Sequence, residues 1–420
     1  MQFSKFATRF TSHSGIVQLM EDLGSALSGE QNVCMLGGGN PSHIPQVQQF
    51  IHERMQRILD NPAEFAHVIG DYDSPQGETL FIQALAKLFR TEFDWDIGPD
   101  NIALTAGSQA GFFLLFNMIG GEFEDGKIRQ IMLPMIPEYI GYADVGLVDN
   151  LFVARKPVIE KLDDHTFKYH INFDELNITE DIGALCVSRP TNPTGNVLTD
   201  SEIGHLLEIA RDRNVPLIID NAYGMPFPNI VFTEANPVWN ENVILCMSLS
   251  KVGLPGARTG IIMAPQEVIK AITNMNAVLN LALGSFGPAL ALDLVSSGEI
   301  TRISNTIIKP YYQRKAERAI QLIKQEFDGI DYYMHKAEGA IFLWLWFPGM
   351  PISSQELYQR LKQRGVLVIS GHHFFPGLNE DWRHMHECIR VTYSMRDDIV
   401  RQGVQIIAEE IRKAYNGQEK

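Results

Sequence analysis

Short apolar runs alternate with longer helical stretches between about residues 100 and 300. The apolar runs are as short as typical strands, and the stretches between them are long enough to return the chain to the same side of a sheet. This alternation predicts parallel strands joined by helical crossovers, and therefore an α/β fold. The expected strands are Asn101–Thr105, Arg129–Leu133, Ala184–Ser188, Leu217–Asp220 and Val243–Met247.

The pattern changes near residue 310, where an amphipathic helix is followed by mixed strands and helices. The elements expected there are a helix at Tyr311–Phe327, a strand at Gly339–Phe347, a helix at Ser354–Gly365 and a strand at Val366–Ile369. We therefore predict a large domain at residues 46–308 and a smaller α+β domain at residues 309–420. Residues 1–45 are expected to form an N-terminal arm and part of the small domain, with the glycine-rich loop Gly37–Pro41 able to approach a ligand closely.

Composition narrows the possible functions. A chain of 420 residues, 45% of them apolar, is long enough for two domains with their own cores. The net charge of −15 and the absence of a basic run argue against nucleic acid as a partner. The longest apolar runs, Gly111–Gly121 and Ala340–Pro348, are well short of the roughly 20 residues that span a bilayer. No membrane partner is expected.

The cysteines and the N-terminus bear on location. Four cysteines lie far apart, mostly among apolar residues, as is typical of buried reduced thiols in a cytoplasmic protein. The first twenty residues carry Lys5 and Arg9 and no acidic residue, but they lack the continuous apolar segment of a signal peptide. We expect an arm of the mature protein.

Lys251 is the residue with the clearest chemical implication. It ends the run Ser-Leu-Ser-Lys after an apolar strand, and Arg258 follows seven residues later. A buried lysine beside a phosphate-binding serine and arginine set can form a Schiff base with pyridoxal phosphate. The Ser-Leu-Ser-Lys run alone is weak evidence for such a site. The other residues that the site needs lie upstream in the required order, namely Asn192-Pro-Thr-Gly195, Asp220 and Tyr223.

Each of these residues has a task at a pyridoxal phosphate site and an ordinary alternative. Asp220 would stabilise the protonated pyridine nitrogen, although aspartate is also common in turns. Asn192 and Tyr223 would bond the phenolic oxygen, although Asn-Pro-Thr-Gly is a common turn sequence. Tyr139 would stack on the ring, although an aromatic residue after a strand is often plain core. The residues expected around the phosphate are Gly107, Ser108, Gln109, Ser248, Ser250 and Arg258.

Arg390 lies inside the apolar strand-like run Cys-Ile-Arg-Val-Thr-Tyr. An unpaired guanidinium would be costly to bury, so Arg390 should meet an anion. A structural carboxylate and a substrate α-carboxylate are both consistent with this position.

Four histidines lie close together in the sequence and are candidate metal ligands: His372, His373, His384 and His386. Their spacing matches none of the common zinc patterns, so we predict no metal and expect them in a loop near the active site or on the surface. Arg189 precedes the Asn-Pro-Thr-Gly turn, and the pattern assigns it no role.

The ordered motifs resemble the fold type I, aspartate aminotransferase-like family of pyridoxal phosphate enzymes over almost the whole chain. The resemblance implies a mostly parallel seven-stranded sheet in the large domain. It also implies a homodimer with shared sites, because Tyr72 in Tyr-Asp-Ser-Pro-Gln-Gly matches the tyrosine that reaches the partner's phosphate. The positions that agree with the family's site are Gly39, at the substrate carboxylate, and Tyr139, Asn192, Asp220, Tyr223, Lys251, Arg258 and Arg390.

Longer segments such as Glu138–Asp144, Ser188–Asn196 and Gly371–Gly377 resemble one bacterial branch of this family. That branch implies amino-group exchange between L-valine or L-alanine and pyruvate or 3-methyl-2-oxobutanoate. Two alternatives stay open. A carbon–sulfur β-lyase would use the same cofactor residues, and a pyridoxal phosphate-binding regulator would need a DNA-binding module for which residues 1–30 are too few and too weakly basic.

Overall fold

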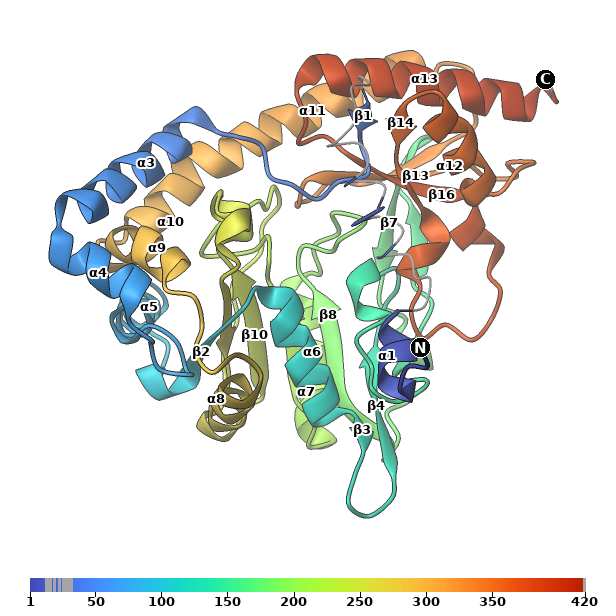
Figure 1. The fold of residues 1–420 in the computed structure, drawn as a ribbon. Coiled ribbons are helices and arrows are strands. Elements are labelled where there is room, and N and C mark those ends of the chain that lie inside the picture. The colour runs from blue at the N-terminus through green and yellow to red at the C-terminus, as the bar shows by residue number, and fades with distance from the viewer. Residues whose placement is uncertain (12–16, 18–19, 22–23, 25–32, 418–420) are drawn as a thin grey trace.

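The computed structural model describes residues 1–11, 17, 20–21, 24 and 33–417, and it contains two main sheets with helices around them (Figure 1). The larger sheet has eight strands in the order β2-β11-β10-β9-β8-β4-β3, with β5 also paired to β4. Strands β4, β5, β8, β9 and β10 pair in parallel, whereas β11 runs antiparallel to both of its neighbours. The predicted mostly parallel sheet of seven strands is confirmed, and the two-residue strand β3 adds an eighth.

The central strands of the larger sheet are apolar runs that are buried on both faces. Strand β8 is buried at every position, as expected for a parallel strand covered by helices on both sides. The bounds of its strands are β2 (Ile102–Thr105), β3 (Gly121–Glu122), β4 (Ile128–Leu133), β5 (Phe152–Ala154), β8 (Ile182–Ser188), β9 (Leu217–Asp220), β10 (Val243–Ser248) and β11 (Gly260–Met263).

The second sheet has six strands in the order β15-β16-β13-β12-β7-β6. Its strands are β6 (Val158–Lys161), β7 (Thr166–His170), β12 (Tyr333–His335), β13 (Phe342–Trp346), β15 (Ile369–Ser370) and β16 (Cys388–Thr392). The hairpin β6–β7 therefore joins the C-terminal sheet, although it lies within the range predicted for the large domain. Nothing in the sequence of the hairpin marks this, because the pairing of β7 with β12 joins segments more than 160 residues apart.

The N-terminal segment also reaches the C-terminal part of the chain. Strand β1 (Cys34–Met35) pairs in parallel with β14 (Val366–Leu367), and α13 packs against both. In Figure 1, α13 lies along the top of the molecule above β13 and β16. This arrangement carries the loop after β1 to the junction between the two sheets.

The helices follow the amphipathic segments of the sequence. Helix α7 begins at a capping box in which the Thr199 side chain accepts from the backbone N–H of Glu202. The α-helices are α1 (Lys5–Phe10), α3 (Pro45–Asp60), α4 (Pro62–Gly70), α5 (Thr79–Phe93), α6 (Ser108–Ile119), α7 (Asp200–Asp212), α8 (Gln266–Asn280), α9 (Phe286–Ser296), α10 (Glu299–Ile303), α11 (Lys309–Glu326), α12 (Ser354–Gln363) and α13 (Asp397–Tyr415). Among the described residues, no helix combines the length and apolar character needed to cross a bilayer.

Candidate active site

The predicted site residues gather where the strands β8, β9 and β10 end. Lys251 lies in the single turn η4 (Ser250–Val252) directly after β10. Its Nζ donates a hydrogen bond to the Gly39 carbonyl oxygen at 2.6 Å and lies 5.4 Å from the centre of the Tyr223 ring. The surrounding protein and the nearby Arg390 and Arg258 guanidinium groups lower the pKa of Lys251 to about 8.

Asp220 ends β9 in the middle of the larger sheet and is buried. It pairs with Ser188 of β8 on one side and with Cys246 of β10 on the other. Its Oδ2 accepts a hydrogen bond from the Tyr142 hydroxyl at 2.7 Å, and its Oδ1 accepts one from the Ala222 N–H at 3.0 Å. Burial raises the pKa of the Asp220 carboxyl, and these hydrogen bonds oppose that shift.

The predicted phosphate loop lies against Arg258. Gly107 precedes α6 with a φ of 86°, and Arg258 is itself left-handed with a φ of 47°. A Cβ on Gly107 would overlap the Arg258 guanidinium, and the positive φ would strain any other residue, so glycine is favoured at this position. Ser108 and Gln109 are the first residues of α6, so their N–H groups have no acceptor within the helix. A helix N-terminus with an adjacent guanidinium is suited to bind a phosphate.

Three of the residues predicted to surround the phosphate form hydrogen bonds within the chain. The Ser248 hydroxyl oxygen accepts from the Ser250 N–H at 2.9 Å, which shapes the turn before Lys251. Gln109 donates through Nε2 to the Gly141 carbonyl at 2.8 Å, and its Oε1 is buried without a hydrogen-bond partner in the described chain. That oxygen is a free acceptor beside the loop.

Arg390 is buried in β16 without a carboxylate partner among the described residues. Its Nη1 donates to Asn192 Oδ1 and its Nη2 to the Gly37 carbonyl, each at 2.6 Å. The Nε has no hydrogen-bond partner in the part of the chain that the structure describes. Burial lowers the pKa of Arg390 to about 10. The structural carboxylate considered above is therefore not present, and the guanidinium remains able to bind an anionic ligand.

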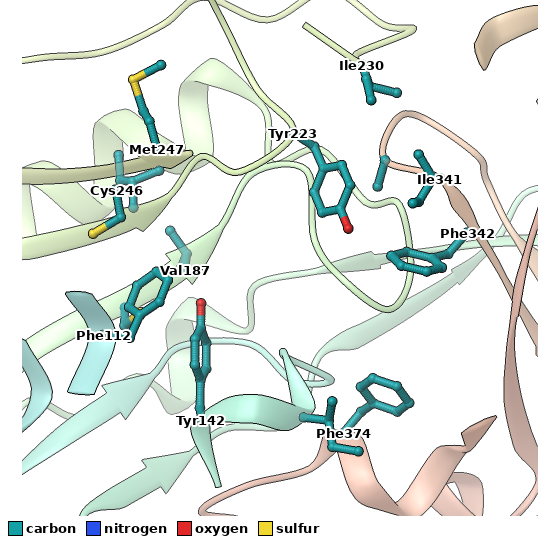
Figure 2. Close-up of a cluster of buried hydrophobic side chains, with 14 of the residues drawn as sticks. Phe112, Tyr142, Val187, Tyr223, Ile230, Cys246, Met247, Ile341, Phe342 and Phe374 are labelled. Atoms are coloured by element: carbon teal, nitrogen blue, oxygen red, sulfur yellow. The ribbon is translucent and has the colours of Figure 1, made fainter. Parts of the chain in front are cut away.

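Aromatic rings surround this guanidinium. The Arg390 Cζ lies 4.0 Å from the centre of the Phe342 ring and 5.1 Å from that of Phe374. Phe342 in turn contacts Tyr223 edge to face. Figure 2 shows the Tyr142 and Tyr223 hydroxyl groups pointing inward from opposite sides of this region, with Phe342 and Phe374 beside them. The Arg390 guanidinium is thus a fixed cation surrounded by apolar surface.

Two of the predicted cofactor-binding residues, Tyr139 and Tyr72, form no hydrogen bond with the other predicted site residues in the described part of the chain. Tyr139 is partly buried, with its ring edge to face against Tyr142. Tyr72 lies between α4 and α5 and is 83% exposed. Its side chain is therefore accessible to a second molecule.

Arg189, which the sequence left without a role, ties the loop after β8 to its surroundings. Its side chain donates to the Leu198 carbonyl at 2.7 Å, the Asn236 carbonyl at 2.8 Å and the Asp200 carboxylate at 2.6 Å. These contacts hold the segment that carries Asn192.

The histidine cluster makes contacts with other protein groups. His372 Nδ1 lies 2.8 Å from Ser370 Oγ, and His386 Nε2 lies 2.7 Å from an Asp381 oxygen. His384 bonds the Tyr169 hydroxyl in the interior. His372 and His373 belong to the turn that ends at Phe374, so this pair lies in a loop next to Arg390.

Comparison with known proteins agrees with this geometry. A family model described as aminotransferase class I and II matches residues 32–407. The chain belongs to this aminotransferase family. It is 49% identical over 415 residues to the valine–pyruvate aminotransferase of Escherichia coli K12, covering 99% of each chain.

Solved structures of the aminotransferases show the same architecture. A putative amino-acid aminotransferase from Psychrobacter arcticum superposes with a TM-score of 0.97 at 46% identity, with 100% of both chains covered. The valine–pyruvate aminotransferase of Salmonella typhimurium LT2 gives 0.88 at 48% identity, covering 96% of this chain and 100% of that one. Aspartate aminotransferase from Thermus thermophilus, at 18% identity and a TM-score of 0.77, covers 98% of this chain and 100% of that one and supports the fold alone.

Aminotransferases of this family depend on pyridoxal phosphate, and the residues present fit that cofactor. A buried carboxylate at Asp220 suits a protonated ring nitrogen, and the amine of Lys251 has a lowered pKa. The close approach of Gly107 to Arg258 forms a cradle in which a Cβ would not fit. The donor set thus offers a complementary group to the aldehyde, the ring nitrogen and the phosphate.

Sequence reasoning missed the residues that support this set. Tyr142 was not predicted to bond Asp220, and Phe342 and Phe374 were not predicted to contact Arg390. A signal for Tyr142 existed, because Tyr139 and Tyr142 are three residues apart in a short segment that follows a strand. The two phenylalanines carried no comparable signal, since they read as ordinary core residues.

Proposed function

We propose that this aminotransferase exchanges the amino group between L-valine or L-alanine and pyruvate or 3-methyl-2-oxobutanoate in two half-reactions. The observation that carries the proposal is the 49% identity, over 99% of both chains, to an enzyme named valine–pyruvate aminotransferase. The buried guanidinium of Arg390 and the aromatic rings around it support the same substrates.

Arg390 is the group that would bind the substrate α-carboxylate. Its guanidinium is already oriented by Asn192 Oδ1 and the Gly37 carbonyl, so little side-chain entropy is lost on binding. The rings of Phe342 and Phe374 exclude water around it, which strengthens its attraction for an anion. The same rings offer apolar surface to a small aliphatic side chain such as that of valine or alanine.

The proton transfer falls to Lys251. When bound, pyridoxal phosphate supplies an aldehyde that takes up the amino group and a ring that accepts the electrons of the α-carbon. Lys251 Nζ, with a pKa of about 8, can take the proton from the substrate α-carbon and deliver it again near neutral pH. The Gly39 carbonyl accepts a hydrogen bond from Nζ and fixes its position. The Asp220 carboxylate would stabilise the protonated form of the ring nitrogen.

We also propose that the chain works as a cytoplasmic homodimer in which Tyr72 reaches the phosphate site of the partner. The 83% exposure of Tyr72 supports this, because it leaves the side chain accessible to a second subunit. Large apolar side chains are exposed on the preceding helix α4 and at the end of α8, as at an oligomer interface. They are Ile69, Val278, Leu279 and Leu281. The four free, buried thiols are compatible with a reducing compartment.

Transfer of an isotope label tests the substrate proposal. Purified protein with pyridoxal phosphate is incubated with 15N-labelled valine and unlabelled pyruvate, and alanine is analysed by mass spectrometry. Appearance of 15N-alanine, with glutamate and aspartate as much poorer donors, is the expected result. Unlabelled alanine, or efficient transfer from aspartate alone, would contradict the proposed substrate pair. Sedimentation of the same sample tests the dimer, which a monomer at micromolar concentration would exclude.

A further inference from the structure

Glu138 is a buried carboxyl group that the mechanism above does not use. It lies immediately before Tyr139 and is 1% exposed. Its Oε1 accepts a hydrogen bond from the Ser188 N–H at 2.8 Å, and its Oε2 forms a short hydrogen bond with the Ser188 hydroxyl. Its backbone N–H donates to the Phe374 carbonyl at 2.8 Å. The carboxyl is therefore held in one place behind the cofactor site.

The hydrogen bonds of Ser188 continue toward Asp220. Ser188 Oγ lies 3.4 Å from the Tyr142 hydroxyl oxygen, and that hydroxyl donates to Asp220 Oδ2 at 2.7 Å. Ser188 and Asp220 are also direct neighbours in the register of β8 and β9. A chain of three contacts, with Ser188 and Tyr142 between the ends, thus connects two buried carboxyl groups.

The charges around this chain favour one anion and not two. Glu138 has no Lys, Arg or His partner within ion-pair distance among the described residues, and the ionisable groups that face it are Asp220, Tyr142 and Cys186. Asp220 is different, because the Lys251 amine stabilises its charged form. Burial raises the pKa of Glu138 to about 8; the hydrogen bonds from Ser188 and from the Tyr139 N–H oppose this shift, and the proximity of Asp220 adds to it. Burial raises the pKa of both carboxyl groups, but only Asp220 has a nearby amine, so this arrangement favours the proton on Glu138 and the negative charge on Asp220 at neutral pH.

The protonation state of Glu138 then determines which group is the donor in each hydrogen bond between Glu138 and Asp220. The Ser188 hydroxyl donates to Glu138 Oε2 when that carboxyl is ionised. A neutral Glu138 would reverse this bond and donate to Ser188 Oγ, which would free the Ser188 proton for the 3.4 Å contact with Tyr142, while Tyr142 donates to Asp220 Oδ2. If Glu138 were ionised, the Ser188 proton would point back to Glu138, and the contact between Ser188 and Tyr142 would have no proton. Donation in one direction polarises each successive hydroxyl and strengthens the final bond to the Asp220 carboxylate.

We propose that Glu138 is a neutral positioning residue that acts through Ser188 and Tyr142 to hold Asp220 ionised and oriented toward the ring nitrogen of the cofactor. This inference rests on the pyridoxal phosphate site and not on which amino acid is the donor. Its tests contain no substrate, so their outcome is distinguishable from the outcome of the label-transfer experiment.

Infrared spectroscopy of the full-length protein with pyridoxal phosphate tests the protonation of Glu138. At pH 7 the carbonyl band of a buried protonated carboxylic acid should be present in the wild type and absent in Glu138→Gln. The matched control is Glu338→Gln, because Glu338 is a buried glutamate whose pKa is lowered by Lys168 and which is therefore ionised. The control should keep the acid band. An acid band that persists in Glu138→Gln, or that is missing from the wild type, would overturn the proposal.

The nitrogen resonance of 15N-labelled pyridoxal phosphate, measured in the same protein, tests the positioning role. Tyr142→Phe and Ser188→Ala interrupt the chain and should shift the resonance toward that of an unprotonated pyridine, as should Glu138→Leu. Glu138→Gln should restore most of the wild-type shift, because its amide can donate to Ser188 Oγ and accept from the Ser188 N–H. If Glu138→Gln shifts the resonance as far as Tyr142→Phe does, a negative charge at Glu138 is required. That result, or unchanged resonances in Tyr142→Phe and Ser188→Ala, contradicts the proposal. The serine variant keeps the test decisive if Glu138→Leu does not fold.

Discussion

The Lys251 amine donates a hydrogen bond to the Gly39 carbonyl oxygen at 2.6 Å, which joins two residues 212 positions apart. Two residues before Gly39, the Gly37 carbonyl accepts from Arg390 at 2.6 Å. The loop after β1 therefore contacts both the predicted Schiff-base lysine and the predicted carboxylate-binding arginine. It thereby fixes the positions of the Lys251 amine and the Arg390 guanidinium relative to each other.

Capture of pyridoxal phosphate by cofactor-free protein should depend on pH through Lys251. Only the neutral amine attacks the aldehyde, and the pKa of this lysine is lowered to about 8. The rate of capture, followed by the absorbance of the bound cofactor, should fall about tenfold per pH unit below that value and level off above it. A midpoint above pH 10 would contradict the effect of burial and of the two arginines.

Gly107→Ala should weaken cofactor binding. Its φ of 86° disfavours alanine, and the added methyl group would displace the Arg258 guanidinium. We expect the dissociation constant of pyridoxal phosphate to rise about tenfold or more, since backbone strain alone costs about 1–3 kcal/mol. Gly256→Ala is the matched control, because a Cβ there has open space around it. Equal affinity of the two variants would contradict the proposed phosphate cradle.

Arg390→Ala should impair the binding of amino acids and not that of the cofactor. Loss of a buried charge partner costs about 2 kcal/mol or more, so KM for valine and alanine should rise about 30-fold or more. Steady-state kinetics and a separate cofactor titration measure the two effects. The exposed Arg396→Ala serves as the control. An unchanged KM would make Arg390 a purely structural residue.

The buried pair Lys168 and Glu338 should stabilise the contact between the two sheets. Lys168, on β7, bonds Glu338 and Asn196 Oδ1, which follows the turn that contains Asn192. Lys168→Met leaves Glu338 buried, with the half-exposed Lys336 as its one basic partner within the described chain. The free energy of unfolding, measured by urea titration, should fall by about 3 kcal/mol.

Two variants check the origin of this loss. Lys168→Met combined with Glu338→Gln should recover at least half of it, because the uncompensated charge is gone while the Val197 N–H keeps an acceptor. Lys336→Met, which removes the half-exposed partner, should cost about 1 kcal/mol at most. If Lys168→Met is no more destabilising than Lys336→Met, the pair has no special role.

The sequence predicted the elements that local pattern determines. The strand at residues 217–220 has the predicted bounds, because a continuous apolar run ended by aspartate leaves little ambiguity. Asp220 and Lys251 could be chosen because they lie at or directly after the ends of successive strands, and Arg258 because it follows Lys251 by seven residues. The predicted roles of these residues remain to be tested.

Contacts between distant segments could not be predicted in the same way. The placement of the hairpin β6–β7 in the C-terminal sheet depends on pairing with β12, and the contact of Phe374 with Arg390 depends on how a late loop folds back. The hydrogen bond between Tyr142 and Asp220 likewise joins a turn to a strand 78 residues later. Such contacts are set by tertiary packing, for which a single sequence holds no periodic signal.

The most direct test of the account is a half-reaction screen. Single L-amino acids are added to the purified protein with bound pyridoxal phosphate and no oxo acid, and the absorbance of the cofactor is followed, with Lys251→Ala as the inactive control. Valine and alanine should each convert the cofactor to its amino form in one turnover, and pyruvate should reverse the change. If the absorbance instead stays constant while cystathionine yields pyruvate continuously, the protein is a carbon–sulfur β-lyase and the proposed function is wrong.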